Sequence, residues 1–255
     1  ICEKINKKAK SIVNEHKEPK EYDKNTGFLT KIFKELSSKT HFSYIKGILL
    51  IVFLQWFLFN LLDFQYTKAV YQNASHIVLD AGSSFEHAFV HDLGRLFILF
   101  SGSALLIQLF VGSRLISSLG IIGSMILHPI VTLLSLFGLT LSFNFRNAVL
   151  AKNNFTITNV VYMNAYHSSY YSINEEAREH LRALLDGIIR PLGALFGTIA
   201  LIILQQFFID NELVFYINIS MIIVTLFLLY TTYNQQNKYT DLAIHDLQNS
   251  KIKMK

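Results

Sequence analysis

Long uncharged apolar stretches dominate the central part of the chain. No Lys, Arg, Asp or Glu occurs in residues 47–62, 96–113, 115–145, 191–209 or 213–237. A helix needs about 20 mainly apolar residues to cross a bilayer core about 30 Å thick. The helices of soluble proteins keep a polar face on their solvent side, and these stretches lack a charged one. The pattern therefore predicts an all-α, polytopic integral membrane protein.

The apolar pattern predicts six transmembrane helices. They are expected at residues 44–66, 93–113, 119–143, 155–172, 183–209 and 213–233. Polar loops are expected at residues 67–92 and 144–154, a charged segment at 173–182, and tight turns at 113–118 and 210–212. The fourth of these helices is the most polar, so a surface helix or a re-entrant segment stays open as an alternative for it.

Three regions follow from this pattern. Residues 1–42 form a basic segment, which is expected as a cytoplasmic linker with an amphipathic helix near residues 28–36 on the membrane surface. Residues 43–235 form the six-helix transmembrane domain, and 236–255 a polar tail. The first residue is Ile, which indicates either a start inside a longer polypeptide or a processed N-terminus.

The distribution of positive charge predicts the orientation. With six spans both termini lie on one side, together with the Lys-rich head, the Lys-bearing tail and Arg114, Arg178 and Arg182. Because Lys and Arg are enriched in cytoplasmic loops, both termini are expected to be cytoplasmic. The expected location is a bacterial inner membrane, with an organelle membrane as the alternative.

The composition narrows the possible functions. Hydrophobic residues make up 51% of the chain and charged residues 16%, which fits a protein in contact with a lipid bilayer. The single cysteine, Cys2, excludes an intramolecular disulfide and a cysteine metal cluster. The sequence contains no phosphate-binding glycine loop, metal-ligand spacing or nucleophile elbow, so we expect no enzyme, cofactor or metal. No basic groove with interleaved aromatics indicates nucleic acid.

Asp186 and Arg190 form the sharpest candidate site. They lie four residues apart, hence on one helical face of the predicted fifth span. Pro191 then removes a backbone hydrogen bond, and nearby small residues would let helices approach closely. These small residues are Gly187, Gly193 and Gly197. Charges inside a membrane normally face a cavity or a partner. Arg190 therefore either binds an anionic substrate with Asp186 as its partner, or forms a structural ion pair at the membrane boundary.

Other polar residues in the predicted spans are further candidates. Asp63, near the end of the first span, either pairs with a cation or accepts protons, or else anchors the helix at the interface. Asn164 and His167 belong to the polar fourth span, and a face towards an aqueous cavity accounts for them. His128 precedes Pro129, and a buried, hydrogen-bonded histidine is the favoured interpretation.

The order of these elements resembles the C-terminal six-helix half of a major-facilitator-type carrier. The similarity lies in the Lys-rich segment, the LDFQY end of the first span at residues 62–66, the short turn at 113–120, the polar fourth span and the tract REHLRALLDGIIRPLG at 178–193. Within that fold the chain is most similar to the bacterial and plastid ATP/ADP antiporter family and its uncharacterised bacterial relatives. Asp186, Arg190 and Gly193 match the family pattern, whereas Ala194 and Leu195 stand where nucleotide exchangers continue with Lys-Ser.

The resemblance implies a secondary carrier that exchanges nucleotides or related organic anions by alternating access. Such a carrier has twelve helices in two halves, so the expected partners are the lipid bilayer, a small anionic substrate and an N-terminal six-helix half, supplied by upstream sequence or a second chain. Arg190, Asp186, Asn164, His167 and Asp63 are the expected substrate-binding residues. The alternative is a membrane sensor or scaffold that has a carrier-like bundle and does not transport.

Overall fold

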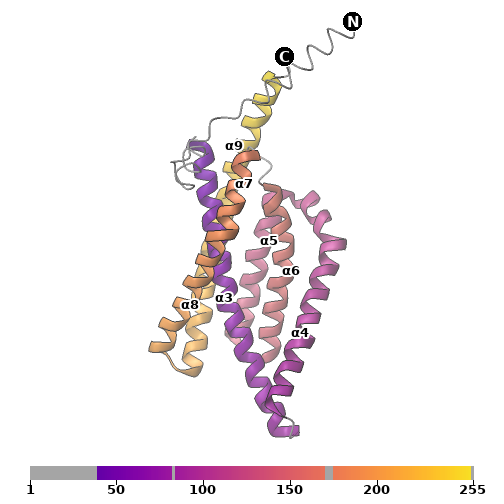
Figure 1. Cartoon of the computed structure of the whole chain (residues 1–255), viewed down its shortest axis with the longest axis vertical. Helices are drawn as coiled ribbons and strands as arrows, with labels where there is room; N and C mark the ends of the chain where they lie inside the picture. The colour runs from indigo at the N-terminus through magenta and orange to yellow at the C-terminus, as the bar shows by residue number, and fades with distance from the viewer. Residues whose placement is uncertain (1–38, 82–83, 170–174, 254–255) are drawn as a thin grey trace. The chain divides into compact units, whose positions relative to one another are not determined.

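The computed structural model describes residues 39–81, 84–169 and 175–253 (Figure 1). They fall within the second of two units, Leu36–Lys255, and the first unit is Ile1–Glu35. The predicted basic linker and its amphipathic helix at residues 28–36 therefore lie outside the described residues.

The described residues are helical, as the apolar pattern predicted. The α-helices are α3 (Lys39–Ala81), α4 (Phe85–Ile107), α5 (Ser113–Leu141), α6 (Phe145–Ser169), α7 (Glu175–Leu184), α8 (Arg190–Phe207) and α9 (Asp210–Lys253). Two π-helical segments, η1 (Gln108–Gly112) and η3 (Leu185–Ile189), join α4 to α5 and α7 to α8. Within the described part of the chain no strand occurs, so the all-α class is confirmed there.

Among the described residues, four helices are long and apolar enough to cross a membrane, which indicates an integral membrane protein. They cover Ser43–His76, Phe85–Leu141, Arg178–Phe207 and Glu212–Thr240. The predicted number of six spans is not confirmed by this count. The count takes Phe85–Leu141 as one stretch of 57 residues, whereas the prediction divided it into two spans, and the helix is interrupted inside this stretch at Gly120. The described residues of the predicted fourth span, 155–169, belong to α6, which is not among these four helices.

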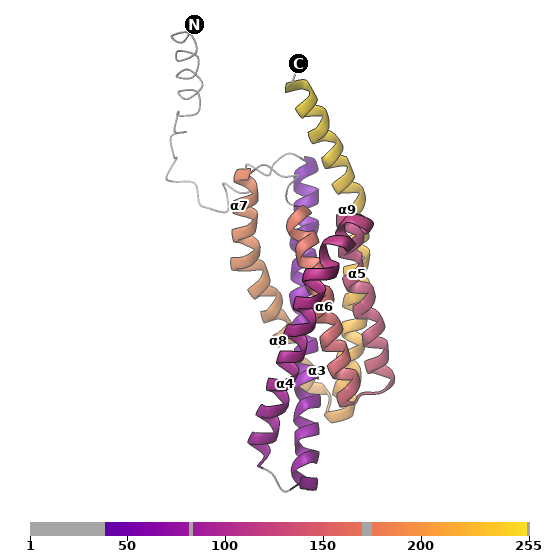
Figure 2. The same cartoon turned by 90° about the vertical axis from the view of Figure 1, so that its right-hand side faces the viewer.

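Gly120 interrupts the long helical stretch of α4 and α5. Its φ of 75° and ψ of 176° are not helical and lie where glycine meets no steric penalty. Figures 1 and 2 show that α5 runs back in the direction opposite to α4 after this point. The predicted tight turn at residues 113–118 was therefore misplaced, because those residues are helical and the break comes at Gly120.

The two polar loops predicted at residues 67–92 and 144–154 are mostly helix. In the first, α3 continues to Ala81 and α4 begins at Phe85. Tyr71 packs edge-on against Phe85, with ring centroids 4.9 Å apart, and Asn73 Nδ2 donates to Asp92 Oδ2 at 3.0 Å. These contacts between the two helices stabilise helical turns that a search for apolar runs does not detect.

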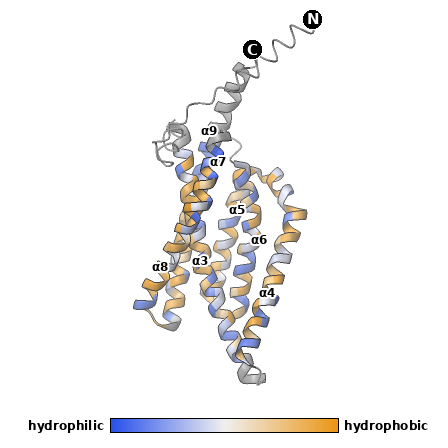
Figure 3. Cartoon of the chain, viewed as in Figure 1, coloured by the Kyte–Doolittle hydropathy of each residue, from blue (hydrophilic) through white to orange (hydrophobic). Residues whose placement is uncertain are grey.

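Asn144 explains why α6 begins ten residues before its predicted start. Its side-chain Oδ1 accepts a hydrogen bond from the backbone N–H of Asn147 at 2.9 Å, as an N-cap residue does. The predicted loop at residues 144–154 is therefore the first part of α6. The charged segment at 173–182 likewise contains α7, which stands out as hydrophilic in Figure 3.

Helix α3 lies at the centre of the packing. It contacts α4, α6, α8 and α9, and α6 in turn contacts α4 and α5. Large apolar side chains on α4, α8 and α9 are exposed, among them Phe97, Ile202 and Ile223. Figure 3 shows the same hydrophobic character along α8 and α9. Such exposed apolar surface fits contact with lipid, whereas a soluble monomer rarely exposes so much of it.

Two glycines bring α8 into close contact with α3. A Cβ atom added at Gly193 would lie 2.6 Å from the carbonyl oxygen of Phe53, and one added at Gly197 would lie 2.9 Å from Cβ of Asn60. Asn60 Nδ2 donates to the carbonyl oxygen of Ala194 at 2.9 Å in the same interface. The predicted close helix approach is thus found at Gly193 and Gly197, while Gly187 has open space around it.

We expect Gly193→Ala to destabilise the bundle by about 1–3 kcal/mol, because the new methyl group overlaps the backbone of α3. Gly187→Ala is the matched control on the same continuous helical segment, and it should be neutral or stabilising because nothing lies within 4 Å of its added Cβ. Thermal unfolding in detergent measures the stability of both purified variants. Equal midpoints for the two variants would contradict the close α3–α8 approach.

Candidate functional site

The polar residues of α6 are directed to three different neighbouring helices. Towards α4, Ser103 Oγ donates to Asn153 Oδ1 at 2.9 Å. Towards α3, Gln55 Nε2 donates to Asn159 Oδ1. Unpaired polar groups are costly in a membrane, and these bonds satisfy them inside the bundle. Phe155, Tyr162 and Tyr166 are fully buried, so α6 packs among its neighbouring helices.

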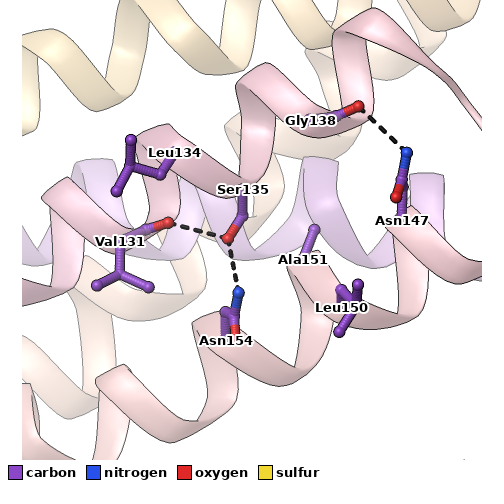
Figure 4. Close-up of a pocket in the computed structure, with 8 residues that line it drawn as sticks. All are labelled: Val131, Leu134, Ser135, Gly138, Asn147, Leu150, Ala151 and Asn154. Carbon is purple, nitrogen blue, oxygen red and sulfur yellow. Dashed lines mark hydrogen bonds between the residues drawn. The ribbon is translucent and has the colours of Figure 1, made fainter.

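Hydrogen bonds also join α6 to α5, around a hollow of about 270 Å³ that Figure 4 shows in close-up. Asn154 Nδ2 donates to Ser135 Oγ at 3.0 Å, and Asn147 Nδ2 donates to the carbonyl oxygen of Gly138 at 3.3 Å. Ser135 Oγ in turn donates to the carbonyl oxygen of Val131 at 2.9 Å. These groups therefore bind one another, and none of the described residues that line this hollow is charged.

His128 on α5 is buried and hydrogen-bonded, as the sequence favoured. Its Nδ1 lies 2.8 Å from Thr158 Oγ1 on α6. Its ring also packs edge-on against Phe155, with centroids 4.6 Å apart. These contacts hold α5 against α6 in the interior. They account for the burial of His128, so we do not include it in the candidate substrate site.

Asp186 and Arg190 form the ion pair that their spacing predicted. Arg190 Nη1 lies 2.9 Å from Asp186 Oδ1, and the pair bridges η3 and the first turn of α8. The guanidinium lies 5.7 Å from the ring centroid of Trp56 on α3, and Nη2 lies 4.0 Å from the sulfur of Met163 on α6. Arg190 therefore faces the region between α3 and α6.

The structure places only part of the predicted site around Arg190. His167 on α6 lies within electrostatic range of Arg182, Arg190 and Asp186. Asn164 lies on another side of α6, where its Nδ2 is 3.6 Å from the position of a Cβ at Gly112 in η1.

Asp63 lies farther along α3 and pairs with Lys152 of α6. Lys152 Nζ is 2.7 Å from Asp63 Oδ1 and 4.1 Å from the ring centroid of Phe59. The sequence had suggested a cation partner for Asp63, but it assigned Lys152 to a loop. The position of Lys152 could have been predicted from a row of residues on one helical face. These residues stand at positions 152, 156, 159, 163 and 167.

These contacts define what we call the α3–α6 seam. It consists of Gln55, Trp56, Phe59 and Asp63 from α3, of Lys152, Asn159 and Met163 from α6, and of the Asp186–Arg190 pair, whose guanidinium approaches Trp56 and Met163. The two ion pairs lie at different levels of the seam. Arg190 lies near Trp56 and Lys152 pairs with Asp63, and these two α3 residues are seven positions apart, about 10 Å along the helix. Two hollows, of about 650 and 70 Å³, lie along the seam, and Phe59 lines both.

In both ion pairs the cation is more buried than the carboxylate. The Lys152 side chain is 9% exposed and that of Asp63 is 51% exposed. The Arg190 side chain is 21% exposed and that of Asp186 is 45% exposed. A buried cation that loses its anion is strongly disfavoured, whereas about half of each carboxylate side chain is left uncovered by the protein. Each cation thus needs an anion, but that anion need not be the carboxylate of the protein.

No protein-family model matches the chain, and comparison with curated proteins and with solved structures gave no significant match.

We expect Thr158→Val to destabilise the protein by about 1–3 kcal/mol, because it leaves the buried Nδ1 of His128 without its partner. Thr132→Val is the matched control on α5. The hydroxyl of Thr132 is also buried but has no hydrogen-bond partner among the described residues, so its loss should be neutral or stabilising. Thermal unfolding in detergent compares the two. A larger loss for Thr132→Val than for Thr158→Val would contradict the hydrogen bond as a stabilising contact.

Proposed function

We propose that the chain is half of a secondary carrier that moves a small organic anion, such as a nucleotide, by alternating access. The observation that carries this proposal is the asymmetry of the two ion pairs in the α3–α6 seam, where each cation is more buried than its carboxylate. A substrate anion can replace a half-exposed carboxylate on its cation without leaving a buried charge unpaired. In this mechanism Arg190 binds the anion. Asp186 positions Arg190 and pairs with it when no substrate anion is bound.

The proposal includes six membrane crossings. The reversal at Gly120 supports two crossings within Phe85–Leu141, since a straight helix of 57 residues would be about 85 Å long, far more than a bilayer. Helix α6 is too polar to face lipid on all sides, but its contacts with α3, α4 and α5 shield it. With six crossings, both termini lie on one side, and the excess of Lys and Arg there favours the cytoplasm.

Alternating access requires a second body against which this half can move. The proposed partner is an N-terminal six-helix half, either upstream in the same polypeptide or in a second chain. The partial exposure of the charged groups in the seam supports this arrangement, because charges at a lipid-facing surface would be costly. The membrane is proposed to be a bacterial inner membrane, or else that of an organelle.

A non-transporting membrane sensor or scaffold is the second candidate. It is favoured by the hydrogen bonds that satisfy Asn153, Asn154 and Asn159 within the bundle, since polar groups used in this way do not line a path. In that case both ion pairs would be structural ties between helices. The two candidates differ in whether the seam is reached by water and substrate.

We expect Arg190→Ala to lower anion transport more than about tenfold, as the loss of a charge-assisted hydrogen bond predicts. Arg190→Lys should retain only part of the transport activity, because an ammonium group cannot reproduce the two-pronged hydrogen bonding of a guanidinium group. Exposed Arg114 supplies the control Arg114→Ala, which should transport normally. Uptake into proteoliposomes is measured with a panel of nucleotides and other organic anions, and thermal unfolding reports folding. Normal transport by folded Arg190→Ala would rule out this site.

Cysteine labelling tests whether water reaches the seam. In a Cys2→Ser background, single cysteines at Met163 and His167 should react with a membrane-impermeant thiol reagent, since both residues are partly exposed near Arg190. Cysteines at Val161 and Ala165 are the controls on the same helix, because these residues are buried against neighbouring helices. Labelling is measured in vesicles of both orientations. Equal protection of all four positions would support the sensor or scaffold.

A further inference from the structure

The larger hollow, of about 650 Å³, lies between α3, α4 and α6, away from Arg190. Its walls are mainly apolar and aromatic, with Tyr66, Leu93, Phe97 and Phe100 among them. Val90 and Phe97, on the α4 side, are 66% and 70% exposed, so the rim of the hollow is apolar as well. A volume of this size and a mostly apolar lining are typical of small-molecule sites.

Lys152 is the cation of this hollow. Its ammonium group has three N–H donors, and the described residues give it one carboxylate acceptor, Asp63 Oδ1 at 2.7 Å. The rest of its surroundings are aromatic: the rings of Phe59 and Tyr66 have their centroids 4.1 and 5.9 Å from Nζ. Aromatic faces attract a cation but accept no strong hydrogen bond. The ammonium group therefore retains donors for a second acceptor inside an apolar cavity.

We propose that this hollow binds an amphiphilic organic anion, a carboxylate with an aliphatic body, whose head replaces Asp63 on Lys152. The half-exposed Asp63 side chain can turn to water while the buried ammonium group stays in place with the incoming carboxylate. The aliphatic body packs against the aromatic walls and the apolar rim. This site goes beyond the proposed carrier function, because it is built from other residues than Arg190 and needs no transport.

Asp63 and Lys152 then have opposite effects on binding. Lys152 attracts the ligand, so Lys152→Gln should lower its apparent affinity about tenfold or more. Asp63 competes with the ligand for the same cation, so Asp63→Asn should raise the affinity severalfold. A purely structural ion pair has no such asymmetry, because removing either partner would only loosen the fold.

The chain contains one tryptophan, Trp56, which serves as the reporter. Its ring centroid is 5.4 Å from that of Phe59, which lines the hollow. A dibrominated fatty acid bound there should quench Trp56 fluorescence saturably in proteoliposomes of zwitterionic lipid. The methyl ester of the same acid has the same aliphatic body without the charge, so it measures quenching from the bilayer alone. Lys68→Gln removes a positive charge from α3 outside the hollow and should leave binding unchanged.

The expected result is saturable quenching by the acid, weakened by Lys152→Gln, strengthened by Asp63→Asn and retained in Arg190→Ala. Should Lys152→Gln fail to fold, the acid should raise the thermal unfolding midpoint of Asp63→Asn more than that of the unaltered protein, since ligand binding stabilises the folded state. Equal quenching by acid and ester, unchanged affinity in folded Lys152→Gln, or no stabilisation of Asp63→Asn would overturn the proposal. Arg190→Ala that binds the acid but does not transport separates this site from the carrier mechanism.

Discussion

The bundle depends on the need to satisfy the polar side chains of α6 in the interior between its neighbouring helices. Asn153 binds α4, Asn154 and Thr158 bind α5, and Asn159 and Lys152 bind α3. Because unpaired polar groups are costly where water is absent, these bonds specify which helix lies on each side of α6. A helix that is too polar to cross lipid alone thereby fixes the places of its neighbours.

The sequence predicted the elements whose signal is local. Uninterrupted apolar runs located the central parts of α3, α8 and α9, and the i,i+4 spacing of Asp186 and Arg190 predicted an ion pair that the structure contains. Helix ends were predicted less well, because hydropathy follows the thickness of a bilayer and not the length of a helix. Contacts such as that of Asn73 with Asp92 extend α3 and α4 through residues that were predicted to form a polar loop.

The pairing of Lys152 with Asp63 could not be predicted from local spacing, because the two residues are 89 positions apart. Lys152 was assigned to a loop for the same reason that α6 was predicted to begin too late: charged and amide residues lower the hydropathy of its first turns. The N-cap at Asn144 was a readable signal for the true start of the helix. With that start, Lys152 falls on the same helical face as Asn159 and Met163, and its place in the seam follows.

The same need for polar partners separates two kinds of polar residue in this protein. Amide and hydroxyl groups on α6 are satisfied by hydrogen bonds to adjacent helices, and their role is to hold the bundle together. The four charged groups of the α3–α6 seam are paired too, but both carboxylates remain about half exposed, and Asp63 also lines the larger hollow. Shielding such a pair completely would cost the desolvation of both ions, so the exposed carboxylate is the partner that can leave the pair at the lower cost. In the proposed carrier mechanism an external anion would therefore compete at the seam, and not at the α5–α6 interface.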